Sequence, residues 1–358
     1  MERWVYLDGV RGLAALMVAV FHYQGLFAQN QFFDFGYLAV DVFFVLSGMV
    51  LQGMYGQAIA AGTLSAREFT LARIRRLYPL VALAMVCVAV LNAVGVAGSN
   101  ASAASGDALL RGFLLIPSLG ASSAFPANGP LWSLLSEVLV NALWFAVLRL
   151  GGHRALLVLA AITVPAATAL VALHGGSANF GWQGDWALIG HGAVRACGAF
   201  CIGALLTRYR AHVDRLLRSA PAAAILGAAL TLVCSRSVLQ QASPAVSDIV
   251  PTVGCVLGLC LLRTWHAPAL LARVLVWLGA VSYPVYLLHA PLGRLCMAMT
   301  QVAQDLTNDP FYGGADSVLR FALPGSAGAL YLVALLLVAS CVHYGYEKPI
   351  QAWLRRRR

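Results

Sequence analysis

The first apolar segment carries three ionisable residues, Asp8, Arg11 and His22. Arg11 and His22 are eleven positions apart, so at about 100° per residue both lie on one helix face, roughly 16 Å apart along its axis. Asp8 precedes Arg11 by three positions and can orient it as an ion pair. A guanidinium binds phosphate and a neutral imidazole accepts a proton, so this face offers anion-binding and acid–base chemistry. Alternatively, His22 is a core histidine bonded to a backbone carbonyl.

Composition indicates what kind of protein positions these residues. Hydrophobic residues make up 60% of the 358 residues and charged residues only 11%, and the mean hydropathy is +0.78. Soluble domains carry about 25% charged residues, so a soluble fold could not cover its surface with this chain. Disorder is excluded because it requires low hydrophobicity. We predict an all-α polytopic membrane protein that forms a single domain over residues 1–358.

A helix needs about 20 apolar residues to cross a bilayer. About ten segments meet this requirement, and we expect them to surround a polar channel: 8–28, 36–56, 77–98, 131–149, 155–173, 187–207, 220–238, 248–263, 274–299 and 326–346. The apolar stretch 108–119 is too short to span and predicts an interfacial helix in an outer loop.

The positive charges predict the orientation of these spans. The net charge is +10, and 19 of the 24 Lys and Arg residues fall in six segments that share one side when the N-terminus is inside. Because positively charged loops stay in the cytoplasm, both termini are predicted to be cytoplasmic, in a bacterial inner membrane. The basic C-terminal tail is expected to contact anionic membrane lipids. Nucleic-acid binding would need a basic patch on a soluble module, so it is not expected.

Further polar motifs occur in order along the other spans. The second span reads VDVFFVLSGMVL, the third begins FTLARIRRLYPL, the fourth begins LWSLLSEVLV, the ninth contains LGAVSYPVYLLHAPL, and the last ends in YEKP. Ionisable residues in spans are costly and usually face a cavity or a partner. Together with the Arg11–His22 spacing, this series resembles the membrane acyltransferase 3 family over nearly the whole chain. Some members carry an extra esterase-like domain, and this chain is similar to the stand-alone form.

The resemblance implies transfer of an acyl group, commonly acetyl, from cytoplasmic acyl-CoA to a hydroxyl of a carbohydrate or a lipid-linked saccharide outside. It implies acyl-CoA as a co-substrate and no permanently bound cofactor. His22 is expected to act as general base or to carry the acyl group itself, with Arg11 and Glu137 as the other catalytic residues. The histidine and cysteine spacings predict no metal site. The alternative function is a glycolipid transporter or flippase whose polar path is lined by Arg11 and His22.

The resemblance implies that three arginines bind the donor. Arg73 and Arg76 lie one helical turn apart and are candidates for the CoA phosphates, or else for simple membrane anchoring. Arg195 lies inside a span and is a candidate for donor phosphate or for the thioester oxyanion. Its alternative is an ion pair with a buried carboxylate.

Glu137 is expected to orient His22 or to receive the acceptor, unless it is only a first-turn acid favoured by the helix dipole. Ser47 and Gly48 are expected to allow close approach of neighbouring helices. The remaining polar and aromatic residues of the motifs are expected to support the cavity or to bond across helices. The full supporting set is Asp8, Asp41, Ser47, Trp132, Ser133, Ser282, Tyr286 and His289.

Overall fold

The computed structural model describes residues 5–27, 35–96, 105–217, 268–307 and 316–356, with 248, 249, 252–254, 256 and 258. Over these residues the chain forms helices and no strand. Seven of the described helices are long and apolar enough to cross a membrane. The predicted all-α membrane fold is confirmed. The predicted span 220–238, and most of 248–263, lie outside the described residues.

The N-terminal helices follow one another through short connections. Helix α1 (Val5–His22) is followed by the short helices η1 (Gln24–Leu26) and η3 (Gly36–Leu38), then by α2 (Ala39–Ala60) and α3 (Ala66–Ala93). A capping box begins α3, in which Ser65 Oγ accepts from Glu68 N–H at 3.2 Å and the Glu68 carboxylate accepts from Ser65 N–H at 2.9 Å. The short helix predicted at 108–119 is present as α4 (Gly106–Leu114).

Helix α5 (Leu131–Leu173) contains two of the predicted spans. Its 43 residues would measure about 65 Å if straight, roughly twice the apolar thickness of a bilayer. Gly152 interrupts the helical path with φ +60°. The segments on either side of α5 are hydrogen-bonded to each other, from Ala124 N–H to Trp182 O at 2.7 Å and from Gly120 N–H to Gly184 O at 2.8 Å. Both ends of α5 therefore lie together, so the chain must reverse at Gly152.

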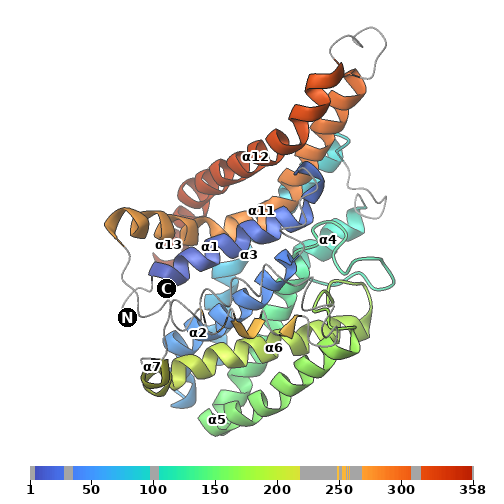
Figure 1. Ribbon diagram of the computed structural model, residues 1–358. Helices are drawn as coiled ribbons and strands as arrows, with labels where there is room; N and C mark the ends of the chain where they lie inside the picture. The colour runs from blue at the N-terminus through green and yellow to red at the C-terminus, as the bar shows by residue number, and fades with distance from the viewer. Residues whose placement is uncertain are drawn as a thin grey trace.

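The remaining described helices complete the bundle (Figure 1). They are α6 (Trp186–Arg208), α7 (Arg210–Leu217), α11 (Ala269–Thr307), α12 (Asp316–Val342), the π-helical turn η6 (His343–Glu347) and α13 (Lys348–Arg356). Helix α1 packs along α11, and α2 packs against α5 and α6. A Cβ atom on Gly48 would lie 2.0 Å from Phe200 O, and one on Gly203 would lie 1.9 Å from Val45 O. The close helix approach predicted at Gly48 is confirmed.

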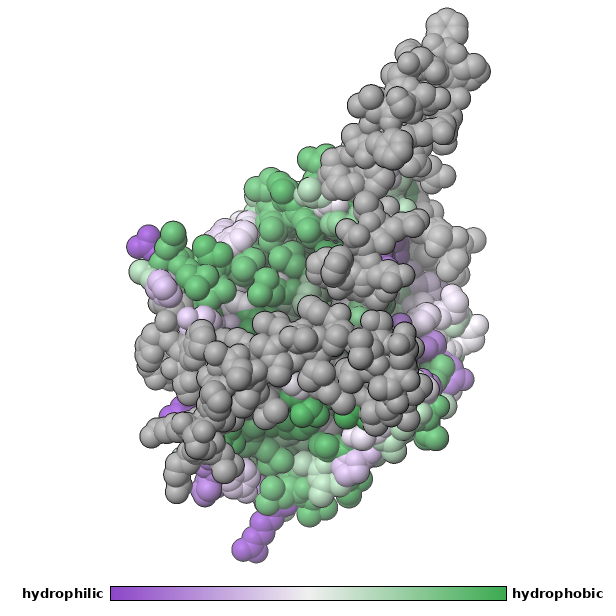
Figure 2. All heavy atoms as spheres, in the orientation of Figure 1, coloured by the Kyte–Doolittle hydropathy of each residue, from purple (hydrophilic) through white to green (hydrophobic). Residues whose placement is uncertain are grey.

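The two ends of the bundle differ in character. The start of α1, helix α7 and helix α13 gather at one end, on the left of Figure 1, and we call it the basic end. The hydrogen-bonded segments 118–124 and 182–184 lie at the opposite end, which we call the loop end. Figure 2 shows hydrophobic side chains over much of the visible helical surface and hydrophilic ones toward the ends. This distribution suits a bundle that is surrounded by lipid.

Candidate functional site

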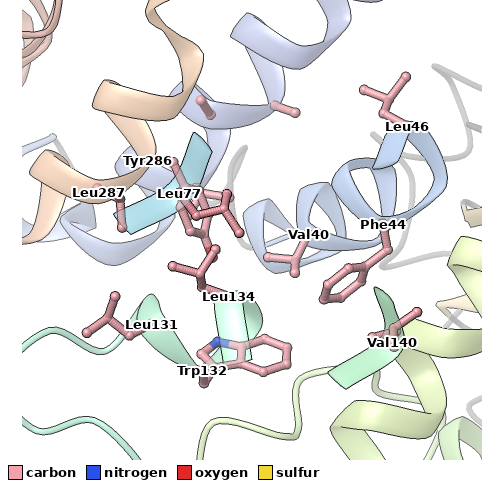
Figure 3. Close-up of a cluster of buried hydrophobic side chains, with 14 of the residues drawn as sticks. Val40, Phe44, Leu46, Leu77, Leu131, Trp132, Leu134, Val140, Tyr286 and Leu287 are labelled. Carbon is pink, nitrogen blue, oxygen red and sulfur yellow. The ribbon is translucent and has the colours of Figure 1, made fainter. Parts of the chain in front are cut away.

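A cavity of about 180 Å³ lies where α1, α2, α3, α5 and α11 meet. Figure 3 shows part of its apolar wall, where Val40, Leu77 and Leu134 come together from different helices beside Tyr286. The polar lining comes from five separate spans, so only the folded bundle assembles it. Eight of the predicted site residues line the cavity: Arg11, Ser47, Arg73, Arg76, Ser133, Glu137, Ser282 and Tyr286.

Arg11 enters the cavity from α1 and is fixed there by α11. Its Nε donates to Ser282 Oγ at 3.0 Å, and its Nη2 donates to Gly279 O at 2.5 Å. Nη2 also lies 3.2 Å from Asp8 Oδ1, so the predicted Asp8–Arg11 pair is confirmed. Ser282 is buried and donates to Gly279 O at 2.8 Å. These bonds hold the guanidinium in one orientation against the wall of the cavity.

His22 faces the same neighbouring helix as Arg11, which confirms the shared face. Its ring centroid lies 5.0 Å from that of His289 on α11. His22 Nδ1 lies 2.9 Å from Val18 O, and a carbonyl can only accept, so Nδ1 carries the proton. This is the bond expected of a structural histidine, but it leaves the lone pair of the neutral ring on Nε2. His22 can therefore still accept a proton or attack a carbonyl carbon.

His289 and Tyr286 separate the cavity from His22. His289 is fully buried, and its Nδ1 donates to Tyr286 O at 2.6 Å. Its Nε2 is buried and has no hydrogen-bond partner among the described residues. The Tyr286 ring lies 5.8 Å from the His289 ring, and its hydroxyl is 2.5 Å from Ser133 Oγ. His22 does not line the cavity, so the expected polar channel is not continuous from Arg11 to His22, and the rings of Tyr286 and His289 lie between them.

Glu137 has a different partner from the one that its sequence position suggested. Its Oε1 accepts from Arg73 Nη2 at 2.5 Å and from Ser47 Oγ at 3.1 Å. Both side chains of the ion pair are largely buried. The structure shows no contact between Glu137 and His22, so the expected orientation of His22 by Glu137 is not present. Glu137 instead fixes the Arg73 guanidinium on the cavity wall.

Arg76 is held by a carboxylate that the sequence analysis did not single out. Its Nη1 donates to Oε1 of Glu347, which is 2% exposed. The other oxygen, Oε2, lies 2.7 Å from His343 Nδ1, and the guanidinium lies 5.2 Å from the centre of the Tyr283 ring. Glu347 ends the π-helical turn η6, a local widening of the helix that is frequent at functional sites. The signal in the sequence was the acidic residue of YEKP at the end of an apolar span.

Arg195 is fully engaged in a structural bond network. Its Nε and Nη2 form two parallel bonds to the Asp41 carboxylate, at 2.8 and 2.7 Å. The remaining N–H groups donate to the carbonyls of Tyr37, Ala178 and Phe180. Arg195 does not line the cavity. The expected donor-binding role does not fit this geometry, because a phosphate would find no free N–H group. The buried ion pair, the alternative interpretation, is what the structure contains.

Asp41 and Trp132 support this network rather than the cavity. Asp41 is 5% exposed and supplies the only carboxylate that contacts Arg195 among the described residues. Trp132 is also buried, and the Arg195 guanidinium lies 5.9 Å from the centre of its ring. The network joins α2 and α6 to the loop end, because Ala178 and Phe180 lie between α5 and α6.

The bundle is thus an integral membrane protein with a cavity lined by Arg11, Arg73 and Arg76, and the imidazoles of His22 and His289 lie beyond the Tyr286 wall. A family model described as an acyltransferase domain matches residues 4–345, so the chain belongs to this family of membrane acyltransferases. The chain is also 36% identical over 157 residues to Protein 2 in picA locus from Rhizobium radiobacter, a match that covers 40% of this chain and 81% of the relative. No solved structure matches the chain.

Proposed function

We propose that the protein transfers an acyl group, most simply acetyl, from acyl-CoA in the cytoplasm to a hydroxyl group of a carbohydrate or lipid-linked saccharide on the other side of a bacterial inner membrane. One observation carries the proposal. Arg11, Arg73 and Arg76 share one cavity, and successive ring contacts connect Tyr286 on its wall through His289 to His22.

The donor enters from the basic end in this proposal. Positive charge keeps that end in the cytoplasm, where acyl-CoA is found. Guanidinium groups bind phosphates as rigid forks, and Arg73 and Arg76 are each held in place by a carboxylate. The flexible arm of the donor then passes Arg11 and covers roughly 16 Å along α1 to reach His22.

His22 performs the transfer with its Nε2 lone pair. As general base, it takes the proton of the acceptor hydroxyl while the oxygen attacks the thioester carbon. The carbon–sulfur bond breaks, its electron pair goes to sulfur, and the imidazolium returns the proton to the thiolate. As acyl carrier, the same Nε2 attacks the thioester carbon first, and the carbon–sulfur bond breaks to release the thiolate. The acceptor oxygen then attacks the acyl carbon, the carbon–nitrogen bond breaks and returns its electron pair to Nε2, and the hydroxyl proton passes to the thiolate. A mass shift on the peptide that contains His22 would distinguish the carrier from the base.

The test compares purified wild-type protein with His22→Ala in sealed proteoliposomes, in which the two faces of the membrane are separate compartments. Acyl-CoA is supplied on the basic side, and acceptor glycans isolated from the host envelope are analysed by mass spectrometry. The wild type should release CoA and add the acyl mass, whereas His22→Ala should bind CoA but transfer nothing. His212→Ala is the matched control, because His212 is an exposed histidine on α7. Wild-type transfer by His22→Ala would overturn the role of His22.

The same experiment tests the glycolipid transporter, which also requires polar groups inside the bundle. A transporter would move the glycolipid across the bilayer without consuming acyl-CoA or changing its mass. Glycolipid movement with no mass gain in the wild type would therefore replace the acyltransferase proposal.

A further inference from the structure

A second pocket, of about 520 Å³, opens at the basic end between α2, α3 and the C-terminal helix α13. It shares four lining residues with the inner cavity: Val50, Leu51, Arg73 and Arg76. The two spaces therefore adjoin, and Arg73 and Arg76 stand at their boundary. Its volume lies within the range of about 300–1,000 Å³ that is typical of small-molecule sites. We call it the α13 pocket.

The α13 pocket has an excess of positive charge. Four arginines line it, Arg73, Arg75, Arg76 and Arg355, and no acidic residue does. The carboxylates paired with Arg73 and Arg76 lie outside its lining. Arg75 and Arg355 have no ion pair in the described part of the chain. An anion with several charges is the ligand that such a pocket attracts.

We propose that the α13 pocket binds the nucleotide end of the donor, a nucleoside diphosphate that carries a further phosphate on its ribose. This inference rests on the proposed function and deepens it, because it gives α13 a role beyond contact with lipid. Arg355 and Arg75 supply the two charges that are not already neutralised, and guanidinium forks pair with phosphate oxygens. Tyr55 lines the same pocket and supplies an aromatic ring for contact with the base.

The contacts of α13 link this pocket to the inner cavity. Gln351 lines the pocket, and its Nε2 donates to Glu347 Oε1 at 3.1 Å. The same carboxylate oxygen accepts from Arg76, which lines both spaces. A ligand held by Arg355 thus lies beside the residues that fix Arg76. The nucleotide would remain at the basic end, and only the arm of the donor would enter the cavity.

The experiment uses full-length protein in nanodiscs of phosphatidylcholine alone, so that no anionic lipid competes. The probes are 3′-phosphoadenosine 5′-diphosphate and ADP, and their dissociation constants are measured by calorimetry. Arg355→Gln should weaken binding of the first probe about tenfold, as expected for loss of one charge-assisted contact in a partly exposed pocket. It should also reduce the preference for that probe over ADP, and raise the KM for acyl-CoA while leaving kcat unchanged.

Arg356→Gln is the matched control. Arg356 is the next residue on α13, is also exposed, and does not line the pocket. Equal affinities in wild type and Arg355→Gln, or equal losses in both variants, would overturn the inference. An effect of Arg355→Gln on activity that appears only after phosphatidylglycerol is added would assign Arg355 to a lipid headgroup and also overturn it.

The outcomes for the inference and for the proposed function are separable. If the wild type transfers the acyl group and Arg355→Gln has no effect, nucleotide binding in the α13 pocket is contradicted and the acyltransferase function is supported. If 3′-phosphoadenosine 5′-diphosphate binds in a way that depends on Arg355 but no acyl group is transferred, the role of the pocket is supported and the acyltransferase function is contradicted. Binding of neither probe by the wild type would overturn the pocket.

Discussion

We expect that breaking the ion pair between Asp41 and Arg195 lowers the stability of the fold without weakening the binding of the donor. The side chains of Arg195 and Asp41 are 4% and 7% exposed, and they form two parallel hydrogen bonds. Asp41→Asn keeps the shape of the side chain but leaves the guanidinium buried without a counter-charge. Removing one partner of a buried pair costs about 3–5 kcal/mol, mainly because the other charge stays uncompensated.

This cost converts to a shift in melting temperature that can be measured. At roughly 2 °C per kcal/mol, the lower end of the range for large domains, the expected decrease is about 6–10 °C. Asp107→Asn is the matched control, because Asp107 also pairs with an arginine, Arg111, but the two side chains are 67% and 40% exposed. Exposed pairs contribute about 0–1 kcal/mol, so that control should melt within roughly 2 °C of the wild type.

Thermal unfolding would be followed by size-exclusion chromatography after heating, and CoA affinity would be measured well below the melting temperature. Asp41→Asn should melt early and bind CoA with wild-type affinity, because Arg195 donates only to groups of the protein itself. The reasoning would be refuted by an Asp41→Asn protein that melts like the wild type but binds CoA weakly. That result would return Arg195 to the donor site.

Three further changes test the cavity and the helix packing. Glu137→Gln should tighten CoA binding severalfold in calorimetry, because it frees the charge of Arg73; weaker binding would show that the carboxylate is needed to position the guanidinium. His289→Leu should lower kcat about tenfold or more at unchanged CoA affinity, because it removes a buried hydrogen-bond acceptor, Nε2, beside His22. A kcat equal to that of the wild type would contradict this expectation. Gly48→Leu should give no folded peak in size-exclusion chromatography, because its Cβ would lie 2.0 Å from Phe200 O. Gly190→Ala is the control and should elute like the wild type, because a Cβ at Gly190 would meet no atom within 4 Å.

The sequence by itself determined the class of protein and the geometry within single helices. An apolar length of about 20 residues is a local property, so most spans could be predicted without knowledge of their neighbours. The shared face of Arg11 and His22 and the Asp8–Arg11 pair follow from the helical repeat alone. The order of the motifs along the chain was sufficient to indicate the family, which the match over residues 4–345 shows.

Only the tertiary structure decided which charges meet. Arg73 and Glu137 are 64 positions apart, and Arg76 and Glu347 are 271 apart. Helical periodicity relates residues on one helix, whereas these pairs depend on how separate helices pack and cross. The same limit explains Arg195, whose placement inside a span predicted a partner but not which one. Its carboxylate, Asp41, lies on α2, and α2 reaches α6 because glycines let the two backbones approach closely.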